Sequence, residues 1–268
     1  MTTLTPSAKG LDDQQLRLTQ ARIIRSEWIK FWSVRSTVSS LAAGVLLLVG
    51  VGLITAAVTA SGGQVGGDQL GAADASLGGV MFAQLAFGTL GVLVIAGEYS
   101  TGMIRSTLTA VPTRLPMLGA TLVVLAAVGF TASLTATAVA FTGGQLLIGT
   151  HAASWSDPGV ARAVFGTAAV LTCSGLLGLA LGALLRSTAG AITTLFGVMF
   201  LFDNVVELMI PTSWDGALKY FPGSASGAAA AVVQAPDTLA PLAGLAVFTG
   251  YTLLTALLAA LRLKRSDA

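Results

Sequence analysis

The polar stretch GEYSTGMIRSTLTAVPTR, residues 97–114, separates two apolar runs at residues 77–96 and 115–141. At about 1.5 Å per helical residue, each run is long enough to cross a hydrocarbon core of about 30 Å. The stretch carries Glu98, Arg105 and Arg114. It is therefore a short polar connection between two membrane helices, and the side of the membrane on which it lies decides what can reach it.

The composition is that of an integral membrane protein. Hydrophobic residues make up 54% of the 268 residues and charged residues only 10%, against about 25% charged residues in soluble domains. Mean hydropathy is +0.83. The single cysteine, Cys173, excludes an intramolecular disulfide, and the single histidine, His151, excludes a zinc site built on several histidines.

The apolar runs predict an all-α, polytopic membrane protein with six transmembrane helices. The expected spans are 38–60, 77–96, 115–141, 163–185, 188–210 and 239–261, with loops at 61–76 and 143–162. Only Arg186 and Ser187 join the fourth and fifth spans, so we expect a tight antiparallel hairpin there. The remaining divisions are a disordered lead (1–15), an amphipathic helix (16–36), the six-helix transmembrane domain (37–262) and a tail (263–268).

The amphipathic helix expected at residues 16–36 has an aromatic side and a basic side. Ile24, Trp28, Phe31 and Trp32 fall at i, i+4, i+7 and i+8. Two interpretations remain open: a helix in the headgroup plane of the lipid, or a continuation of the first span. The aromatic residues adjoin a hydrophobic span, which argues against nucleic acid as a partner. Its candidate interfacial residues are Arg25, Glu27, Trp28, Lys30 and Trp32.

The distribution of basic residues predicts the orientation. With the N-terminus in the cytoplasm, 12 of the 14 Lys and Arg residues lie inside, and only Arg162 and Lys219 lie outside. This asymmetry follows the positive-inside rule. We therefore expect both termini, and residues 97–114, to face the cytoplasm of a cell-membrane protein.

Small and hydroxylated residues predict how the spans associate, because lipid offers no hydrophobic drive for helix pairing. The pairs Gly88/Gly91, Gly178/Gly182 and Gly190/Gly197 permit close approach of helix backbones. Eight hydroxyls in spans two to four either line a polar path or bond back to their own helices. They are Thr89, Thr131, Ser133, Thr135, Thr137, Thr167, Thr172 and Ser174.

The sequence lacks the motifs of an ATPase or a hydrolase. None of its four lysines follows a phosphate-binding Gly-rich loop, and no Gly-x-Ser-x-Gly motif occurs. We therefore expect no enzyme activity, no metal and no cofactor in this chain. Asp203 and Glu207 share one face of the fifth span, either as a solvated helix end or as an ion or substrate contact.

Residues 97–114 resemble the cytoplasmic loop of ABC-2 type permeases, the membrane subunits of ATP-binding-cassette exporters, and in particular an actinobacterial branch. The matching residues are Glu98, Tyr99, Gly102, Met103, Ile104, Arg105, Leu108, Pro112 and Arg114. Residues 26–30 look like the interfacial helix of that family. Residues 220–225 resemble its outer segment, which folds partly back into the membrane before the sixth span.

The resemblance implies an ATP-driven exporter in which this chain pairs, as a homodimer or heterodimer, with a separate ATPase subunit that holds ATP and Mg. Glu98, Tyr99, Gly102, Met103, Ile104, Arg105 and Leu108 would form the ATPase-coupling loop. Membrane lipid is the other expected partner. The alternative class is a membrane protein without an ATPase, namely a secondary transporter or a structural subunit of an envelope complex.

Overall fold

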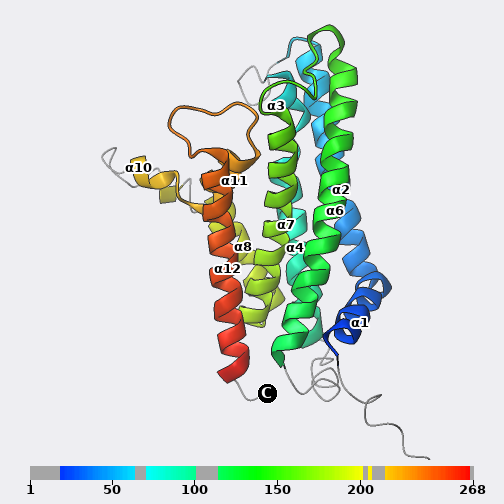
Figure 1. Cartoon of the computed structure of the whole chain (residues 1–268), viewed down its shortest axis with the longest axis vertical. Coiled ribbons are helices and arrows are strands. Elements are labelled where there is room, and N and C mark those ends of the chain that lie inside the picture. The colour runs from blue at the N-terminus through cyan, green and yellow to red at the C-terminus, as the bar shows by residue number, and fades with distance from the viewer. Residues whose placement is uncertain (1–18, 64–70, 101–113, 202–204, 207–214, 266–268) are drawn as a thin grey trace, which may run out of the picture.

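The protein is an antiparallel bundle of long helices (Figure 1). The structure is a computed structural model that describes residues 19–63, 71–100, 114–201, 205–206 and 215–265, and this part of the chain contains no strand. Its elements are α1 (Gln20–Ser33), α2 (Arg35–Ala60), α3 (Ala72–Ser76), α4 (Val80–Ser100), α6 (Arg114–Ile148), η1 (Gly149–His151), α7 (Val160–Leu185), α8 (Thr188–Phe196), η2 (Gly197–Leu201), α10 (Asp215–Leu218), α11 (Pro222–Ala230) and α12 (Pro241–Arg265).

Five of these helices are long and apolar enough to cross a membrane, as expected of a membrane-embedded protein. They correspond to the predicted spans one, two, three, four and six. The fifth predicted span, 188–210, is described as a shorter apolar helix from Thr188 to Leu201. Residues 202–204 and 207–210 lie outside the described residues, so a sixth crossing stays a prediction.

The helix α6 is longer than the third predicted span, and the loop predicted from residue 143 begins only after Ile148. Two glycines suggested a loop, but Gly144 packs against Ser76 of α3, where a Cβ would overlap the Ser76 hydroxyl. The next residue, Gln145, donates through Nε2 to Ser76 Oγ at 2.7 Å and accepts from the Ala153 amide at 2.6 Å. These contacts hold the extra helical turns, because they occupy polar groups that would otherwise need water.

Glycines determine the closest helix pair, α4 with α7. A Cβ on Gly91 would overlap the carbonyl oxygen of Gly175, and one on Gly178 would overlap that of Gly88. The prediction of close approach is confirmed for the glycines of these two helices. It is wrong for Gly190 and Gly197 of α8 and η2, which approach no other helix closely.

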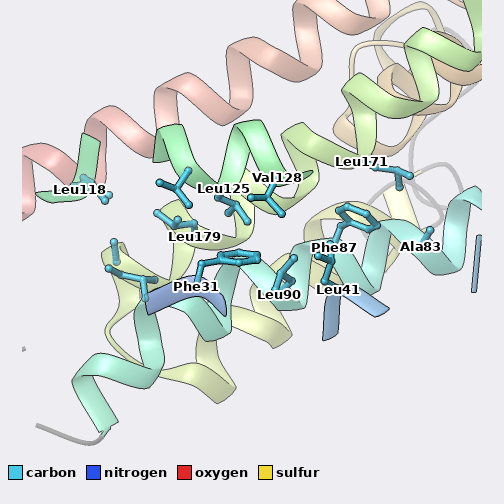
Figure 2. Packing of buried hydrophobic residues seen from close by; sticks show 14 of the residues in the cluster. Phe31, Leu41, Ala83, Phe87, Leu90, Leu118, Leu125, Val128, Leu171 and Leu179 are labelled. Carbon is cyan, nitrogen blue, oxygen red and sulfur yellow. The ribbon is translucent and has the colours of Figure 1, made fainter. Parts of the chain in front are cut away.

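The main core gathers side chains from six helices, α1, α2, α4, α6, α7 and α12, and Figure 2 shows part of it. Phe31 of α1, Leu90 of α4, Leu125 of α6 and Leu179 of α7 lie near one another, each at most 4% exposed. A second cluster joins α7, α8 and α12 to α11, with Phe248 of α12 fully buried. The bundle therefore has interior packing on both sides of α7.

Of the two alternatives left open for the hydroxyls in spans two to four, bonding back to their own helices holds for most of them. Thr131, Thr135, Thr137, Thr172 and Ser174 each donate to a carbonyl of their own helix, three or four residues back. The hydroxyl of Ser133 also donates across to the carbonyl oxygen of Ala168 in α7, at 3.1 Å. A hydroxyl at membrane depth has no water to bond to, so a hydrogen bond to its own helix backbone avoids the cost of an unpaired polar group.

The predicted hairpin between the fourth and fifth spans is confirmed. The helix α7 ends at Leu185, and Arg186 adopts the left-handed conformation with φ of 56°. The hydroxyl of Ser187 then caps α8 by accepting from the Gly190 amide at 3.2 Å. The chain therefore reverses within two residues, and α7 packs against α8.

One end of the bundle carries most of the basic residues that the structure describes. The α1 helix, the start of α6, the α7–α8 junction and the end of α12 all lie at this end (Figure 1). The basic residues there are Arg22, Arg25, Lys30, Arg35, Arg186, Arg262, Lys264 and Arg265. We call it the basic end; which side of a membrane it faces stays a prediction.

Candidate functional site

The candidate site is the junction between α1 and the first turns of α6, at the basic end. The α1 helix ends where Val34 adopts an extended conformation, with φ of −90° and ψ of 111°. The next helix begins at Arg35. The two are therefore separate helices, and α1 packs against the side of the bundle at its basic end (Figure 1).

One face of α1 is buried against the bundle. Its members are Ile23, Glu27 and Phe31, spaced four residues apart and each between 4 and 6% exposed. Trp28 and Trp32, by contrast, are 45 and 48% exposed, with their rings in an edge-to-face pair at 6.0 Å. The three rings do gather on one side of α1, since Phe31 and Trp32 also pair edge to face at 5.5 Å, but of the three only Phe31 is buried.

Glu27 is the chemically notable member of the buried face. Its Oε2 accepts a hydrogen bond from Thr121 Oγ1 of α6 at 2.9 Å and lies 2.5 Å from Lys30 Nζ. A carboxylate in an apolar setting is tolerated only when it is paired and hydrogen-bonded. Lys30 and Thr121 supply those contacts, so Glu27 ties α1 to α6 at a defined register.

Two further contacts fix the same junction. Gln20 Nε2, at the start of α1, donates to the carbonyl oxygen of Pro116 at 3.1 Å. At the other end of α1, Phe31 inserts into the main core, near Leu90 of α4 and Leu125 of α6 (Figure 2). The α1 helix is therefore held at its start and middle to residues 116–121, in the first two turns of α6, and near its end to the main core.

The opposite face of α1 is exposed and carries cations and indoles. Arg22 and Arg25 are exposed, as are Trp28 and Trp32. Indoles and cations on one face of a helix are typical of the headgroup region of a bilayer. This arrangement supports lipid contact at α1.

The predicted coupling loop is described only at its edges. Glu98 and Tyr99 belong to the last turn of α4, where the structure describes their backbone alone. Gly102, Met103, Ile104, Arg105 and Leu108 lie outside the described residues, as do Asp203 and Glu207. What the structure adds is that α4 and α6, which bracket residues 101–113, are both packed against α2.

Sequence reasoning missed Thr121 and Gln20 as partners of this junction. In the sequence, Glu27 is an acidic residue between basic and aromatic ones. It lies four residues from both Ile23 and Phe31, so it shares their helix face and is buried with them. Nothing in the sequence indicates which residue, 94 positions away, would donate to it. That pairing depends on how α1 leans on α6.

The fold and this junction together define a class, namely a helical membrane protein with an amphipathic helix fastened to its bundle. No protein-family model matches the chain, and a search of curated proteins finds no match.

Proposed function

We propose that this chain is the membrane subunit of an ATP-driven transporter, an exporter of the ABC-2 type, working as a dimer with two copies of a separate ATPase subunit. The support is the resemblance of residues 97–114 to the coupling loop of that family, together with the junction between α1 and α6. The chain would supply no ATP site itself, and ATP with Mg would bind in the partner.

The observation that carries the proposal is the pair of bonds from α1 to the turns that follow residues 101–113. Thr121 of α6 donates a hydrogen bond to Glu27 of α1. The carbonyl oxygen of Pro116 accepts one from Gln20 of α1. A displacement of the start of α6 would therefore be passed to α1 through these two hydrogen bonds. Such a rigid connection suits a switch between two packings of the bundle.

In this mechanism the ATPase pair closes on binding ATP and pushes the loop of residues 98–111. The push displaces the start of α6, and α1 moves with it in the headgroup plane. The α4–α7 pair would serve as the frame of this motion, because their backbones are in close contact at Gly91 and Gly178. The substrate path would then open between α1, α2 and the dimer partner.

The competing class, a membrane protein with no ATPase, predicts a different result in one experiment. The full chain is expressed in its native membrane with an affinity tag, and bound ATPase is measured after purification in mild detergent. Glu98→Arg and Gly102→Trp should abolish recovery of an ATP-hydrolysing partner. Gly216→Trp is the control, since Gly216 lies in open space in α10 and outside residues 97–114.

Recovery of the same ATPase from both loop variants would contradict the proposed interface. Absence of any nucleotide-binding partner from the unmodified chain would favour the competing class. The side of the membrane is tested separately by Arg105→Cys in a Cys173→Ala background. Labelling of residue 105 by a membrane-impermeant maleimide from outside intact cells would overturn the proposal.

A further inference from the structure

A pocket of about 390 Å³ lies between α3, α4, η2 and α11, toward the end of the bundle opposite α1. Its volume falls in the range of small-molecule sites. We call it the α3–α11 pocket and define it by Asp74, Gln84, Met199, Ser226 and Gly227. The proposed coupling between α1 and α6 does not use it.

Asp74 places a carboxyl group in the pocket wall. Its Oδ1 accepts a hydrogen bond from the Val232 amide at 3.2 Å, which fixes the carboxylate at the pocket wall. Among the described residues, no Lys or Arg forms an ion pair with it. Arg162 of α7 bonds to the same residue, Val232, but donates to its carbonyl oxygen, at 3.0 Å.

Gln84 gives the pocket an unused donor. The side chain is 8% exposed, and its Nε2 has no hydrogen-bond partner in the part of the chain that the structure describes. A buried amide without a partner costs free energy. A ligand with an oxygen acceptor would recover that cost.

The rest of the wall is apolar and reaches the outer surface of the bundle. Leu77, Val80 and Met199 line it, and Met81 at its edge is 54% exposed. Met199 belongs to η2, a π-helical turn, and such turns are rare and frequent at functional sites. An alkyl chain can therefore run from the pocket onto a surface expected to face lipid.

We propose that the α3–α11 pocket binds an amphiphile whose head carries a primary ammonium group and a nearby oxygen acceptor. The ammonium lies at Asp74, the oxygen accepts from Gln84, and the chain lies along Leu77, Met81 and Met199. The ethanolamine headgroup of a membrane phospholipid and a free amino-ether or amino-alcohol amphiphile share this chemistry. Either source satisfies the unpaired charge and the unused donor together.

The test uses the full chain in phosphatidylcholine nanodiscs without any ATPase, so its outcome is independent of the proposed function. The probe is a diazirine-bearing dodecyl chain that ends in a 2-aminoethyl ether. A matched probe ends in a 2-hydroxyethyl ether. After photolysis, labelled peptides are identified, and the half-saturating concentration of each probe is measured.

We expect labels on peptides from α4 and α11, with the ammonium probe saturating at a concentration lower by at least about tenfold, the size of one charge-assisted contact. Asp74→Asn keeps the acceptor for the Val232 amide and should remove that preference. Gly227→Leu should reduce labelling by both probes, because a Cβ at Gly227 meets open space in the pocket.

Two matched variants control for charge and for bulk. Asp237→Asn removes an exposed acid elsewhere at the same end, and Gly250→Leu adds a side chain to open space on α12. Both should label like the unmodified chain. Phosphatidylethanolamine in the nanodisc should compete with the probe if lipid is the source, and should leave labelling unchanged if a free amphiphile is.

The proposal is overturned if the unmodified chain saturates equally with both probes, or if the ammonium preference survives in Asp74→Asn. Labels confined to α2 or α12, with none on α4 or α11, would also overturn it. Size-exclusion chromatography of each variant shows whether it folds. A variant that fails to fold is replaced by Gln84→Leu, which should weaken binding of both probes without changing the charge of the pocket.

Discussion

Thr121 of α6 donates a hydrogen bond to Glu27 of α1 at 2.9 Å, and the two residues are 2 and 6% exposed. The bond joins a helix that precedes the first span to one that follows the second, across 94 positions of sequence. Its acceptor is a carboxylate already paired with Lys30. The contact therefore fixes the position of α1, which lies outside the membrane spans, relative to the start of α6.

Replacing Thr121 by Val tests this link, because valine keeps the shape and removes the donor. We expect the free energy of unfolding to fall by about 1.5–3 kcal/mol, as for a hydrogen bond to a charged group. Hydrogen exchange of the α1 amides should quicken at the same time. Unfolding is measured by denaturant titration in mixed detergent micelles, and exchange by mass spectrometry.

The control for that variant is Thr131→Val, ten residues further along α6. The Thr131 hydroxyl is exposed and donates only to carbonyls of its own helix. Its loss should change the free energy of unfolding by no more than about 0.5 kcal/mol. Equal effects of the two substitutions would mean that Glu27 gains nothing from α6.

Gly91→Ala tests the close contact of α4 with α7. A Cβ at this position would overlap the carbonyl oxygen of Gly175, which is backbone and cannot rotate away. Overpacking of this kind costs about 1–3 kcal/mol or more. We expect a correspondingly lower free energy of unfolding, measured in the same detergent titration.

Gly250→Ala, on α12, is the matched control because a Cβ there meets nothing within 4 Å. It should be neutral or slightly stabilising, since alanine favours the helix over glycine. If Gly91→Ala were as stable as Gly250→Ala, the two helices would lie further apart than the structure places them.

Gln145→Leu tests the contacts that extend α6 beyond the predicted span. The substitution removes the donor to Ser76 and to the Ala72 carbonyl, and the acceptor for the Ala153 amide. Stability should fall by about 1–3 kcal/mol, the cost of leaving buried polar groups unpaired. Amides of α3 and of residues 146–151 should exchange faster, which peptide-resolved hydrogen exchange would detect. Unchanged protection of α3 would show that glycine packing alone holds it.

The indoles of α1 test its place in the lipid. Trp28 and Trp32 are about half exposed and directed away from the bundle. With Trp155 and Trp214 replaced by Phe, fluorescence in nanodiscs should be quenched strongly by lipids brominated near the headgroup and weakly by lipids brominated at the chain ends. Strong quenching by aqueous iodide, with none by brominated lipid, would place α1 away from the bilayer.

Much of the architecture could be predicted from the sequence because span length and hydropathy are local properties. The five long helices fall where the apolar runs lie, and the Arg186–Ser187 junction reverses the chain as its brevity requires. The ends of the helices could be predicted less closely from the sequence. The α6 helix continues through Gly143 and Gly144 because α3 packs against it there, and that contact lies far away in sequence.

The sequence by itself determined that the chain is helical and membrane-embedded, since every backbone polar group in hydrocarbon must be satisfied within its own segment. It also determined which glycines permit close packing, though not which of them are used. Tertiary structure alone decided that Glu27 is paired with Thr121, that Phe31 is buried whereas Trp28 is exposed, and that Asp74 and Gln84 share a pocket. The reason is physical: periodicity fixes the faces of a helix, whereas the partner of each face depends on how the helices pack.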